Sequence, residues 1–289
     1  MFMSSNQNQK TIVITGCSSG IGYETAIACA KNNFQVFACV RSITTSTKLK
    51  NFIEAENISN LKIIEMDVSK KNSIIAGVNQ ILKHTDQIDI LFNNAGKMVI
   101  GSLEDLSEDE LELQLNTDLI GPILLTQKII PIMRNNKSGL IINMGSIAGK
   151  IGFQLSSPYC ISKFGLEGLS ESLRRELSPY GIDVCVIEAG IVNTKFFENT
   201  RIAEASTKSP YTIDTMNMKT LLDKILKEDF TQPEFVAQEI MKIINENGKN
   251  FRYVIGEDAY HLINASESHK HDYHGMDKEI ESIMSKWIK

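Results

Sequence analysis

The pair of side chains with the clearest chemical potential in this sequence is Tyr159 and Lys163. They lie four residues apart in a segment of helical character, 157–177, and this spacing brings two side chains onto the same face of a helix, one turn apart. A free phenol has a pKa of about 10, and a positive charge beside it favours the phenolate. We therefore predict that Tyr159 is an acid/base whose pKa Lys163 lowers, with a solvated helix face as the alternative for this spacing taken alone.

A glycine-rich turn, residues 15–22, is the second feature that points to chemistry. It follows an apolar run, 11–15, and opens a helical segment rich in alanine. In such a turn Gly16 makes the tight bend, Gly20 lets phosphates approach the amino terminus of the helix, and Gly22 packs the helix on the sheet. Turn glycines without a ligand are the alternative, but the strand–turn–helix context favours a dinucleotide site.

These residues need a scaffold, and the hydrophobic pattern predicts one. Short apolar runs alternate with longer segments of helical period, as in βαβ units around a parallel sheet that is covered on both faces. The strand candidates are residues 11–15, 35–40, 61–66, 88–92, 140–143, 183–187 and 252–255. We therefore predict an α/β fold, a single doubly wound Rossmann-type domain at 11–256 with a seven-stranded parallel sheet flanked by helices, between a polar tail at 1–10 and an extension at 257–289.

A long helix is predicted between the fourth and fifth strands. The sequence Ser107-Glu108-Asp109-Glu110 is a capping box, in which a serine and a glutamate satisfy two amide groups at a helix start. The helix is expected to run to Pro131 or slightly beyond it.

The glycine spacing after Thr15, Gly-x-x-x-Gly-x-Gly, resembles that of the short-chain dehydrogenase/reductase family. Each further match is weak alone, but the matches occur in the family's order and cover residues 10–256. They are Asp67-Val68 after the third strand, Asn93-Asn94-Ala95-Gly96 after the fourth, Asn116 in the long helix, Ser146 after the fifth strand, and Tyr159-x-x-x-Lys163.

The resemblance implies a role for each matching residue. Tyr159 exchanges a proton with the reacting oxygen, Ser146 donates a hydrogen bond to that oxygen, and Asn116 holds a water that relays protons through Lys163. Taken alone, Asn116 could equally well be an ordinary surface amide. For Ser146 taken alone, a simple turn former is the less favoured alternative. The residues expected to line the cofactor are Gly16, Ser18, Ser19, Gly20, Ile21, Gly22, Arg41, Ser42, Asp67, Val68, Asn94, Ala95, Gly96, Tyr159, Lys163, Gly190, Ile191 and Thr194.

Two positions bear on the cofactor. An acidic residue at the end of the second strand binds the ribose of NAD, whereas a nearby arginine accommodates the 2′-phosphate of NADP. Here Val40 holds the acidic position and Arg41 follows it, so NADP(H) is favoured over NAD(H). The alternative is that Arg41 is a surface cation and both cofactors serve. The family's usual Pro-Gly after the sixth strand is Ala189-Gly190, which predicts a less rigid loop, although Thr194 keeps its place.

The substrate is expected to be a small apolar ketone or aldehyde, or the corresponding alcohol. Residues 157–173 and 252–256 resemble the hydroxysteroid and retinol dehydrogenase branch of the family. Residues 191–232 interrupt the βα alternation and are interpreted as a substrate lid. Large apolar side chains in this insertion would furnish part of the pocket wall, with a small core patch as the alternative; they are Phe196, Phe197, Tyr211, Met216 and Met218.

Composition excludes other classes of protein. The net charge is -5, the pI is about 5.6 and no basic run occurs, so a dedicated nucleic-acid binder is not expected. No apolar stretch is long enough for a transmembrane helix, and the five scattered cysteines favour a reducing, cytoplasmic compartment. A homodimer or homotetramer is expected, assembled through the long helices near 107–134 and 157–179.

Three rival interpretations remain. Residues 257–275 hold four of the five histidines, and His269, His271, Asp272 and His274 offer metal-ligand spacing, but a polar surface tail is favoured and no metal is predicted. Cys160 lacks a visible histidine partner and receives no catalytic role. A non-catalytic NADP(H)-binding redox-sensing or scaffold module is disfavoured by the intact Ser146, Tyr159 and Lys163 set.

Overall fold

A seven-stranded parallel sheet forms the centre of the protein in the computed structural model, which describes residues 9–225, 227–228 and 230–287. The strand order β3-β2-β1-β4-β6-β7-β9 reverses direction between β1 and β4, as in a doubly wound sheet. The predicted fold class is therefore confirmed. Residues 1–8 of the predicted tail lie outside the described part of the chain. The strands of this sheet are β1 (Thr11–Thr15), β2 (Gln35–Val40), β3 (Leu61–Glu65), β4 (Ile90–Asn93), β6 (Gly139–Met144), β7 (Ile182–Ala189) and β9 (Arg252–Ile255).

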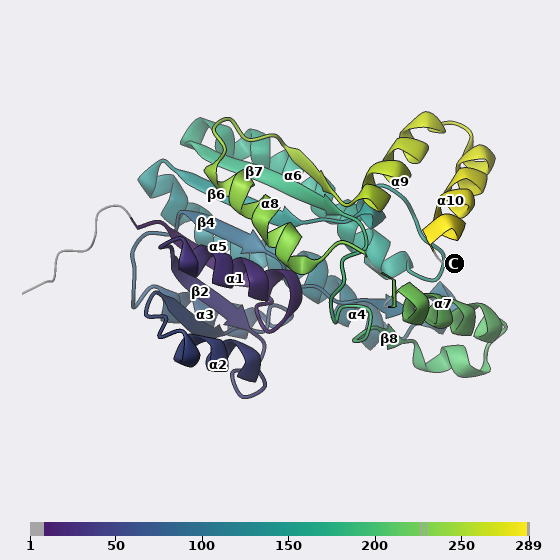
Figure 1. The fold of residues 1–289 in the computed structure, drawn as a ribbon, viewed down its shortest axis with the longest axis horizontal. Helices are drawn as coiled ribbons and strands as arrows, with labels where there is room; N and C mark the ends of the chain where they lie inside the picture. Colours follow the sequence, from purple (N-terminus) through teal and green to yellow (C-terminus); the bar gives the residue numbers. More distant parts are fainter. Residues whose placement is uncertain (1–8, 226, 229, 288–289) are drawn as a thin grey trace, which may run out of the picture.

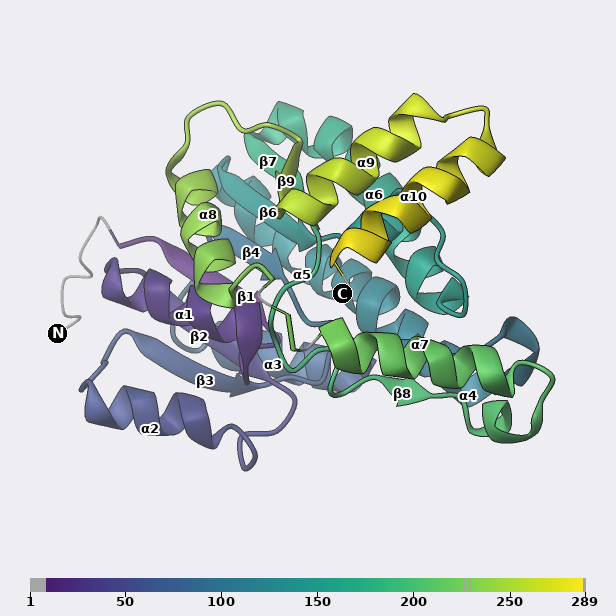
Figure 2. The same ribbon diagram turned by 45° about the vertical axis from the view of Figure 1, so that its right-hand side comes forward.

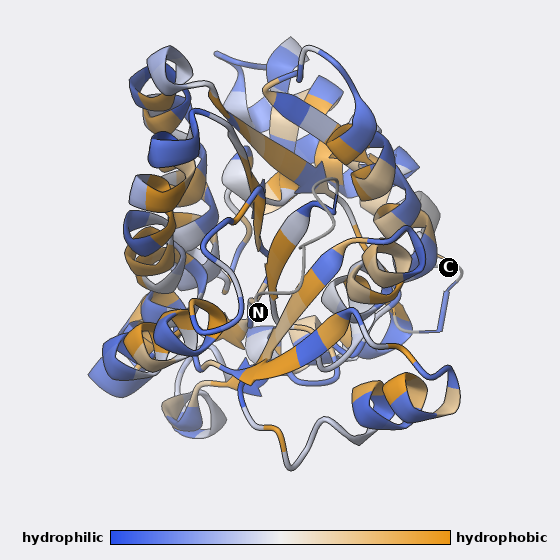
Figure 3. Ribbon diagram, turned by 90° about the vertical axis from the view of Figure 1, so that its left-hand side faces the viewer, coloured by the Kyte–Doolittle hydropathy of each residue, from blue (hydrophilic) through white to orange (hydrophobic). Residues whose placement is uncertain are grey.

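Helices cover both faces of the sheet (Figure 1). One apolar core joins the sheet to α1, α2 and α8, and a second joins it to α3, α5 and α6. Figure 3 shows the apolar strands between these two layers of amphipathic helices. The long helices are α1 (Gly20–Lys31), α2 (Thr47–Ala55), α3 (Lys71–Ile81), α4 (Glu108–Leu115), α5 (Gly121–Asn136), α6 (Ser157–Leu177), α7 (Thr212–Ile225), α8 (Pro233–Asn245), α9 (Glu257–Ser268) and α10 (Tyr273–Trp287).

The predicted long helix is present but contains a π-helical turn. It begins at the predicted capping box, in which Ser107 Oγ accepts from the backbone N–H of Glu110 and the Glu110 carboxylate accepts from the backbone N–H of Ser107. Helix α4 then passes into a π-helical turn, Asn116–Ile120, and continues as α5 to Asn136. The extra residue in a π turn rotates the side chains near it relative to a regular helix. This rotation decides which side chain reaches the site described below.

The predicted insertion, 191–232, folds against the loop before α4. Its short strand β8 (Arg201–Ile202) pairs with β5 (Val99–Ile100) in a separate two-stranded sheet, and a 3-10 turn and α7 follow. The buried carboxylate of Asp105 accepts hydrogen bonds from Ser206 Oγ at 3.1 Å and Ser209 Oγ at 2.8 Å. The insertion is thus tied to the body of the protein by polar contacts.

The carboxyl-terminal extension is a helical hairpin. His271, Asp272 and His274 are exposed on its surface, whereas the residues before them form a helix with a buried apolar face. Figure 2 shows α9 and α10 side by side. Ala259, Leu262 and Ile263 are spaced three or four apart, so they share one face of α9, and that face is buried in an apolar cluster with the loop after β6. His269 Nε2 lies 2.6 Å from a carboxylate oxygen of Glu279 and links the two helices.

Within residues 9–225, 227–228 and 230–287, no group of three or more His, Cys, Asp or Glu side chains is arranged to hold a metal ion. In the same part of the chain, the helices are too short or too polar to cross a membrane.

Candidate active site

The glycine-rich turn joins the end of β1 to the start of α1. Gly16 and Gly20 have φ values of 74° and 60°, a region that favours glycine. Helix α1 begins at Gly20, and in the part of the chain that the structure describes the Ser19 side chain makes no capping hydrogen bond to it. Its first N–H groups are therefore available to an anion such as a pyrophosphate.

Polar contacts from the loop after β4 hold this turn in shape. Asn94 Nδ2 donates to the carbonyl oxygen of Thr15 at 2.8 Å, and Thr15 Oγ1 accepts from the backbone N–H groups of Asn94 and Ala95 at 3.0 Å each. A Cβ at Gly22 would collide with the Asn94 amide and the Gly16 carbonyl. The structure thus brings the predicted residues of the two loops together, and Asn94 braces the turn.

The end of β2 carries the residues predicted to select the cofactor. Val40 is buried and Arg41 is exposed immediately after it. The carboxylate of Glu65, at the end of β3, accepts from the backbone N–H of Ile43 at 3.1 Å and fixes the loop after Arg41. Lys97, in the loop after β4, has its pKa lowered by burial and by the positive charge of Arg41. Two cations therefore share this edge of the sheet.

Three of the predicted catalytic residues lie together. Ser146 follows β6 and is 9% exposed, with its Oγ accepting from the backbone N–H of Ala148 at 3.1 Å. The Ser146 side chain is close enough to the phenol of Tyr159, near the start of α6, to act against the rise in its pKa. One helical turn later, Lys163 Nζ lies 5.4 Å from the centroid of the Tyr159 ring and donates to the carbonyl oxygen of Met144 at 2.9 Å. The arrangement can place a phenol, a hydroxyl and an ammonium around one substrate oxygen.

The side chain that approaches Lys163 from the long helix is Asp118, and sequence reasoning missed it. Asp118 Oδ2 lies 3.6 Å from Lys163 Nζ, and Asp118 Oδ1 accepts from the backbone N–H of Lys97 at 3.0 Å. Asn116 lies only half-buried on the same π-helical turn. No residue type marks this position in the sequence; in the structure, Asp118 follows the buried Gln114 by four residues and lies on the same buried face of the helix.

The pKa of Tyr159 is shifted in the direction opposite to the predicted one. Burial raises it, the charge of Asp118 raises it further, and the hydrogen bond with Ser146 opposes the shift. We expected Lys163 to lower this pKa; burial and the charge of Asp118 instead raise it, and Asp118 also lies 3.6 Å from the ammonium of Lys163. Burial likewise raises the pKa of the Cys160 thiol, which suits packing better than nucleophilic attack.

The turn after β7 is held by a carboxylate from the carboxyl-terminal extension. Asp258 is 4% exposed, and its Oδ2 accepts from the backbone N–H of Ile191 at 2.5 Å. A Cβ at Gly190 would collide with the same carboxylate. This contact restrains Ala189-Gly190, the turn that was expected to be less rigid without a proline. Across the site, the Thr194 side chain packs against Gly20 of the glycine-rich turn.

Side chains of the insertion reach Tyr159. The rings of Phe196 and Tyr159 have centroids 5.8 Å apart, and Phe197 and Met218 belong to the same apolar cluster. Met216 is 40% exposed, so it lies outside this wall. Tyr211 instead lines a separate pocket of about 640 Å³ beside the loops at 101–104 and 153–157.

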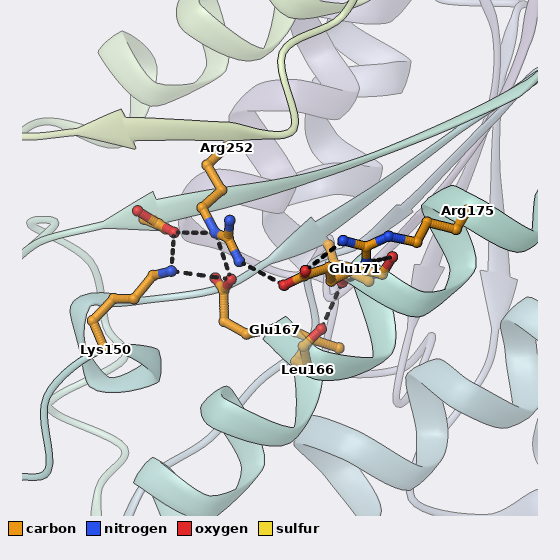
Figure 4. Close-up of polar contacts among 9 residues, drawn as sticks. Lys150, Leu166, Glu167, Glu171, Arg175 and Arg252 are labelled. Atoms are coloured by element: carbon orange, nitrogen blue, oxygen red, sulfur yellow. Dashed lines mark hydrogen bonds and ion pairs between the residues drawn. The ribbon is translucent and has the colours of Figure 1, made fainter. Parts of the chain in front are cut away.

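A network of charged side chains supports the segment after β6 that carries Ser146 (Figure 4). Lys150, four residues after Ser146, lies 3.0 Å from a carboxylate oxygen of Glu188 on β7 and 3.4 Å from one of Glu167 on α6. Arg252 on β9 contacts the same two carboxylates at 3.1 and 2.9 Å. Two cations and two largely buried carboxylates thus join the loop, the sheet and α6, which fixes the backbone that carries the candidate catalytic side chains.

Comparison with known proteins agrees with this geometry. The family model for short chain dehydrogenases matches residues 10–205. The chain is 32% identical over 257 residues to a 3-ketodihydrosphingosine reductase of Bacteroides thetaiotaomicron, covering 89% of this chain and 91% of that protein. It is 30% identical over 255 residues to human 17-beta-hydroxysteroid dehydrogenase type 1, covering 85% of this chain and 77% of that protein.

A solved structure gives the same result for the fold. A short-chain dehydrogenase from Streptomyces avermitilis superposes with a TM-score of 0.81 at 27% identity, covering 94% of this chain and 97% of that one. The chain, which carries both the glycine-rich turn and the Tyr159–Lys163 pair, is a member of the short-chain dehydrogenase family of oxidoreductases.

Proposed function

We propose that this protein is an NADP(H)-dependent oxidoreductase that interconverts an apolar ketone or aldehyde and its alcohol, with Tyr159 as the acid/base. The observation that carries the proposal is the cluster of the partly buried Tyr159 with the buried Ser146 and Lys163 at the carboxyl edge of the sheet. Ligands of open α/β sheets bind at this edge. The names of the two relatives, a reductase of a keto compound and a hydroxysteroid dehydrogenase, support carbonyl–alcohol chemistry.

The side chains have separate tasks in the reduction. Ser146 donates a hydrogen bond to the carbonyl oxygen and orients it toward Tyr159. The phenol O–H bond breaks as its proton passes to that oxygen, and Lys163 lies near the phenolate that remains. The bound nicotinamide supplies the hydride to the carbonyl carbon. In alcohol oxidation the same residues act in reverse, with Tyr159 as the base.

The cofactor preference rests on charge at the end of β2. A carboxylate at position 40 would repel a 2′-phosphate, and the residue there is the buried Val40. Arg41 is exposed beside it. Burial and the positive charge of Arg41 lower the pKa of Lys97. A guanidinium pairs with phosphate through parallel N–H donors, so this edge favours NADP(H).

The apolar substrate class rests on the walls around Tyr159. Phe196, Phe197 and Met218 pack with it from the insertion, and binding pockets for small molecules are mostly apolar with a few polar groups that fix orientation. We infer that 191–232 acts as the substrate lid of a domain spanning 11–256.

The test is a spectrophotometric screen of the purified protein for oxidation of NADPH by ketones, aldehydes and quinones. With an accepted compound, Tyr159→Phe should lower kcat by about 100-fold or more, the scale of general acid catalysis, and should still bind NADPH. Tyr180→Phe, at an exposed tyrosine beyond α6, is the matched control and should keep full activity.

Two outcomes would contradict the proposal. Wild-type kcat in Tyr159→Phe would remove Tyr159 from the mechanism. Binding of NADPH without turnover of any compound in the screen would favour the non-catalytic, redox-sensing or scaffold alternative.

A further inference from the structure

A buried ion pair lies directly behind the acid/base tyrosine. The side chains of Asp118 and Lys163 are 0% and 5% exposed, and Asp118 Oδ2 lies 3.6 Å from Lys163 Nζ. Within the described residues, Asp118 Oδ2 has no hydrogen-bond partner. It therefore faces the ammonium as its counter-charge, and the dry surroundings leave that interaction unscreened by water.

The π-helical turn fixes the carboxylate in this position. Asp118 lies in the middle of Asn116–Ile120, and its other oxygen is held by the backbone N–H of Lys97. A Cβ at Gly121 would collide with the carbonyl oxygen of Val68, so the helix packs closely on the loop after β3. This close packing holds in place the stretch of helix that carries Asp118.

We propose that Asp118 is a positioning residue: its buried carboxylate, 3.6 Å from Lys163 Nζ, compensates the positive charge of Lys163 beside the phenol of Tyr159. The proposal rests on the proposed function of Tyr159. The consequence is that carbonyl reduction is favoured over alcohol oxidation. The protonated phenol needed for reduction is present throughout the neutral pH range, whereas the phenolate needed for oxidation forms only at high pH.

The charges around the phenol agree with this assignment. The titratable and charged groups that face the pair are Lys163, Tyr159 and Cys160 from α6 and Lys97 from the loop after β4. Burial raises the pKa of Asp118 to about 6, and the positive charges of Lys163 and Lys97 oppose that rise. At pH 7 and above, Asp118 is therefore ionised and its negative charge raises the pKa of Tyr159.

Replacing the carboxylate by an amide isolates its charge. Asp118→Asn keeps the shape of the side chain but leaves the ammonium of Lys163 without its counter-charge. An uncompensated positive charge within about 4–6 Å lowers the pKa of an acid by about 1–3 units. The variant should therefore ionise Tyr159 at least about one pH unit lower than the wild type does.

Ultraviolet phenolate absorbance measures this without substrate or cofactor. Because the chain has seven tyrosines, each protein is compared with its own Tyr159→Phe partner, and the difference isolates one phenol. In a titration upward from pH 10, the ordinary midpoint of a free tyrosine, the phenolate signal of the Asp118→Asn difference should appear at least about one pH unit below that of the wild-type difference. Asp109→Asn, an exposed acid on α4, should behave as the wild type.

A double variant tests the mechanism of the shift. Adding Lys163→Met to Asp118→Asn should abolish the low midpoint, because the positive charge that causes it is gone. Circular dichroism at the same pH verifies that each variant is folded. Equal phenolate signals in the wild type and Asp118→Asn would overturn the proposal, even if the protein reduces carbonyls. A shifted midpoint in a protein that turns over no substrate would leave the charge compensation intact and refute the proposed function instead.

Discussion

Replacing Asp258 by alanine should destabilise the protein by about 2 kcal/mol, although this residue belongs to the carboxyl-terminal extension. Its carboxylate accepts from the backbone N–H of Ile191 and sits in the first turn of α9. Leaving a buried N–H without an acceptor costs about 1–3 kcal/mol. Losing an acidic group from the first turn of a helix costs about 0.3–1 kcal/mol more.

The assay is urea denaturation followed by far-ultraviolet circular dichroism. For a slope of about 2–3 kcal/mol per molar urea, the expected loss lowers the midpoint by about 1 M. Asp258→Asn keeps an acceptor oxygen and should lose less. Glu257→Gln is the matched control in the same helical turn, because its side chain is 87% exposed, and surface changes of this kind stay within about 0.5 kcal/mol.

The same variants report on the cofactor site. The turn that Asp258 restrains is the one predicted to border the nicotinamide, so Asp258→Ala should also bind NADPH more weakly than Glu257→Gln does. If Asp258→Ala unfolds at the same urea concentration as Glu257→Gln, the Ala189-Gly190 turn does not depend on this carboxylate, and our account of its restraint is wrong.

Two further predictions concern the cofactor and the lid. Val40→Asp combined with Arg41→Ala should shift the ratio of kcat/KM from NADPH toward NADH, because the change adds repulsion of the 2′-phosphate and removes its partner; a wild-type protein that already prefers NADH would refute this assignment. Hydrogen exchange across 195–225 should be fast without ligand and slow with NADPH and a bound apolar ketone, whereas full protection in the free protein would make the segment purely structural.

The sheet and the glycine-rich turn were predictable because their signals are local. A strand buried on both faces is a continuous apolar run, as in β1, and its boundaries follow from composition. The capping box at Ser107 also depends only on residues three apart. Tyr159 and Lys163 are one turn apart on the regular helix α6, so their spacing in the sequence is enough to bring them together.

The missed features depend on contacts between distant segments or on irregular geometry. Asp118 was passed over for Asn116, because a π-helical turn changes which side chain reaches the sheet edge and no residue type marks such a turn. Asp258 is 67 residues from its partner Ile191, so its role follows only from the folded arrangement. Helix α9 was not predicted because residues 257–275 are mostly polar. Its narrow apolar face is buried only because Ile147 and Ile151, which are distant in the sequence, pack against it.

Helix α9 supports both sides of the catalytic edge, and this has a consequence for biosynthesis. Its apolar face packs under Ile147 and Ile151, next to Ser146, while Asp258 holds the turn at Gly190. A nascent chain that has emerged only as far as β9 already carries every proposed catalytic side chain, yet it lacks this common support. Domains fold progressively during synthesis at about 5–20 residues per second, so we expect the activity to mature after the sheet has formed, when the last helices leave the ribosome and dock.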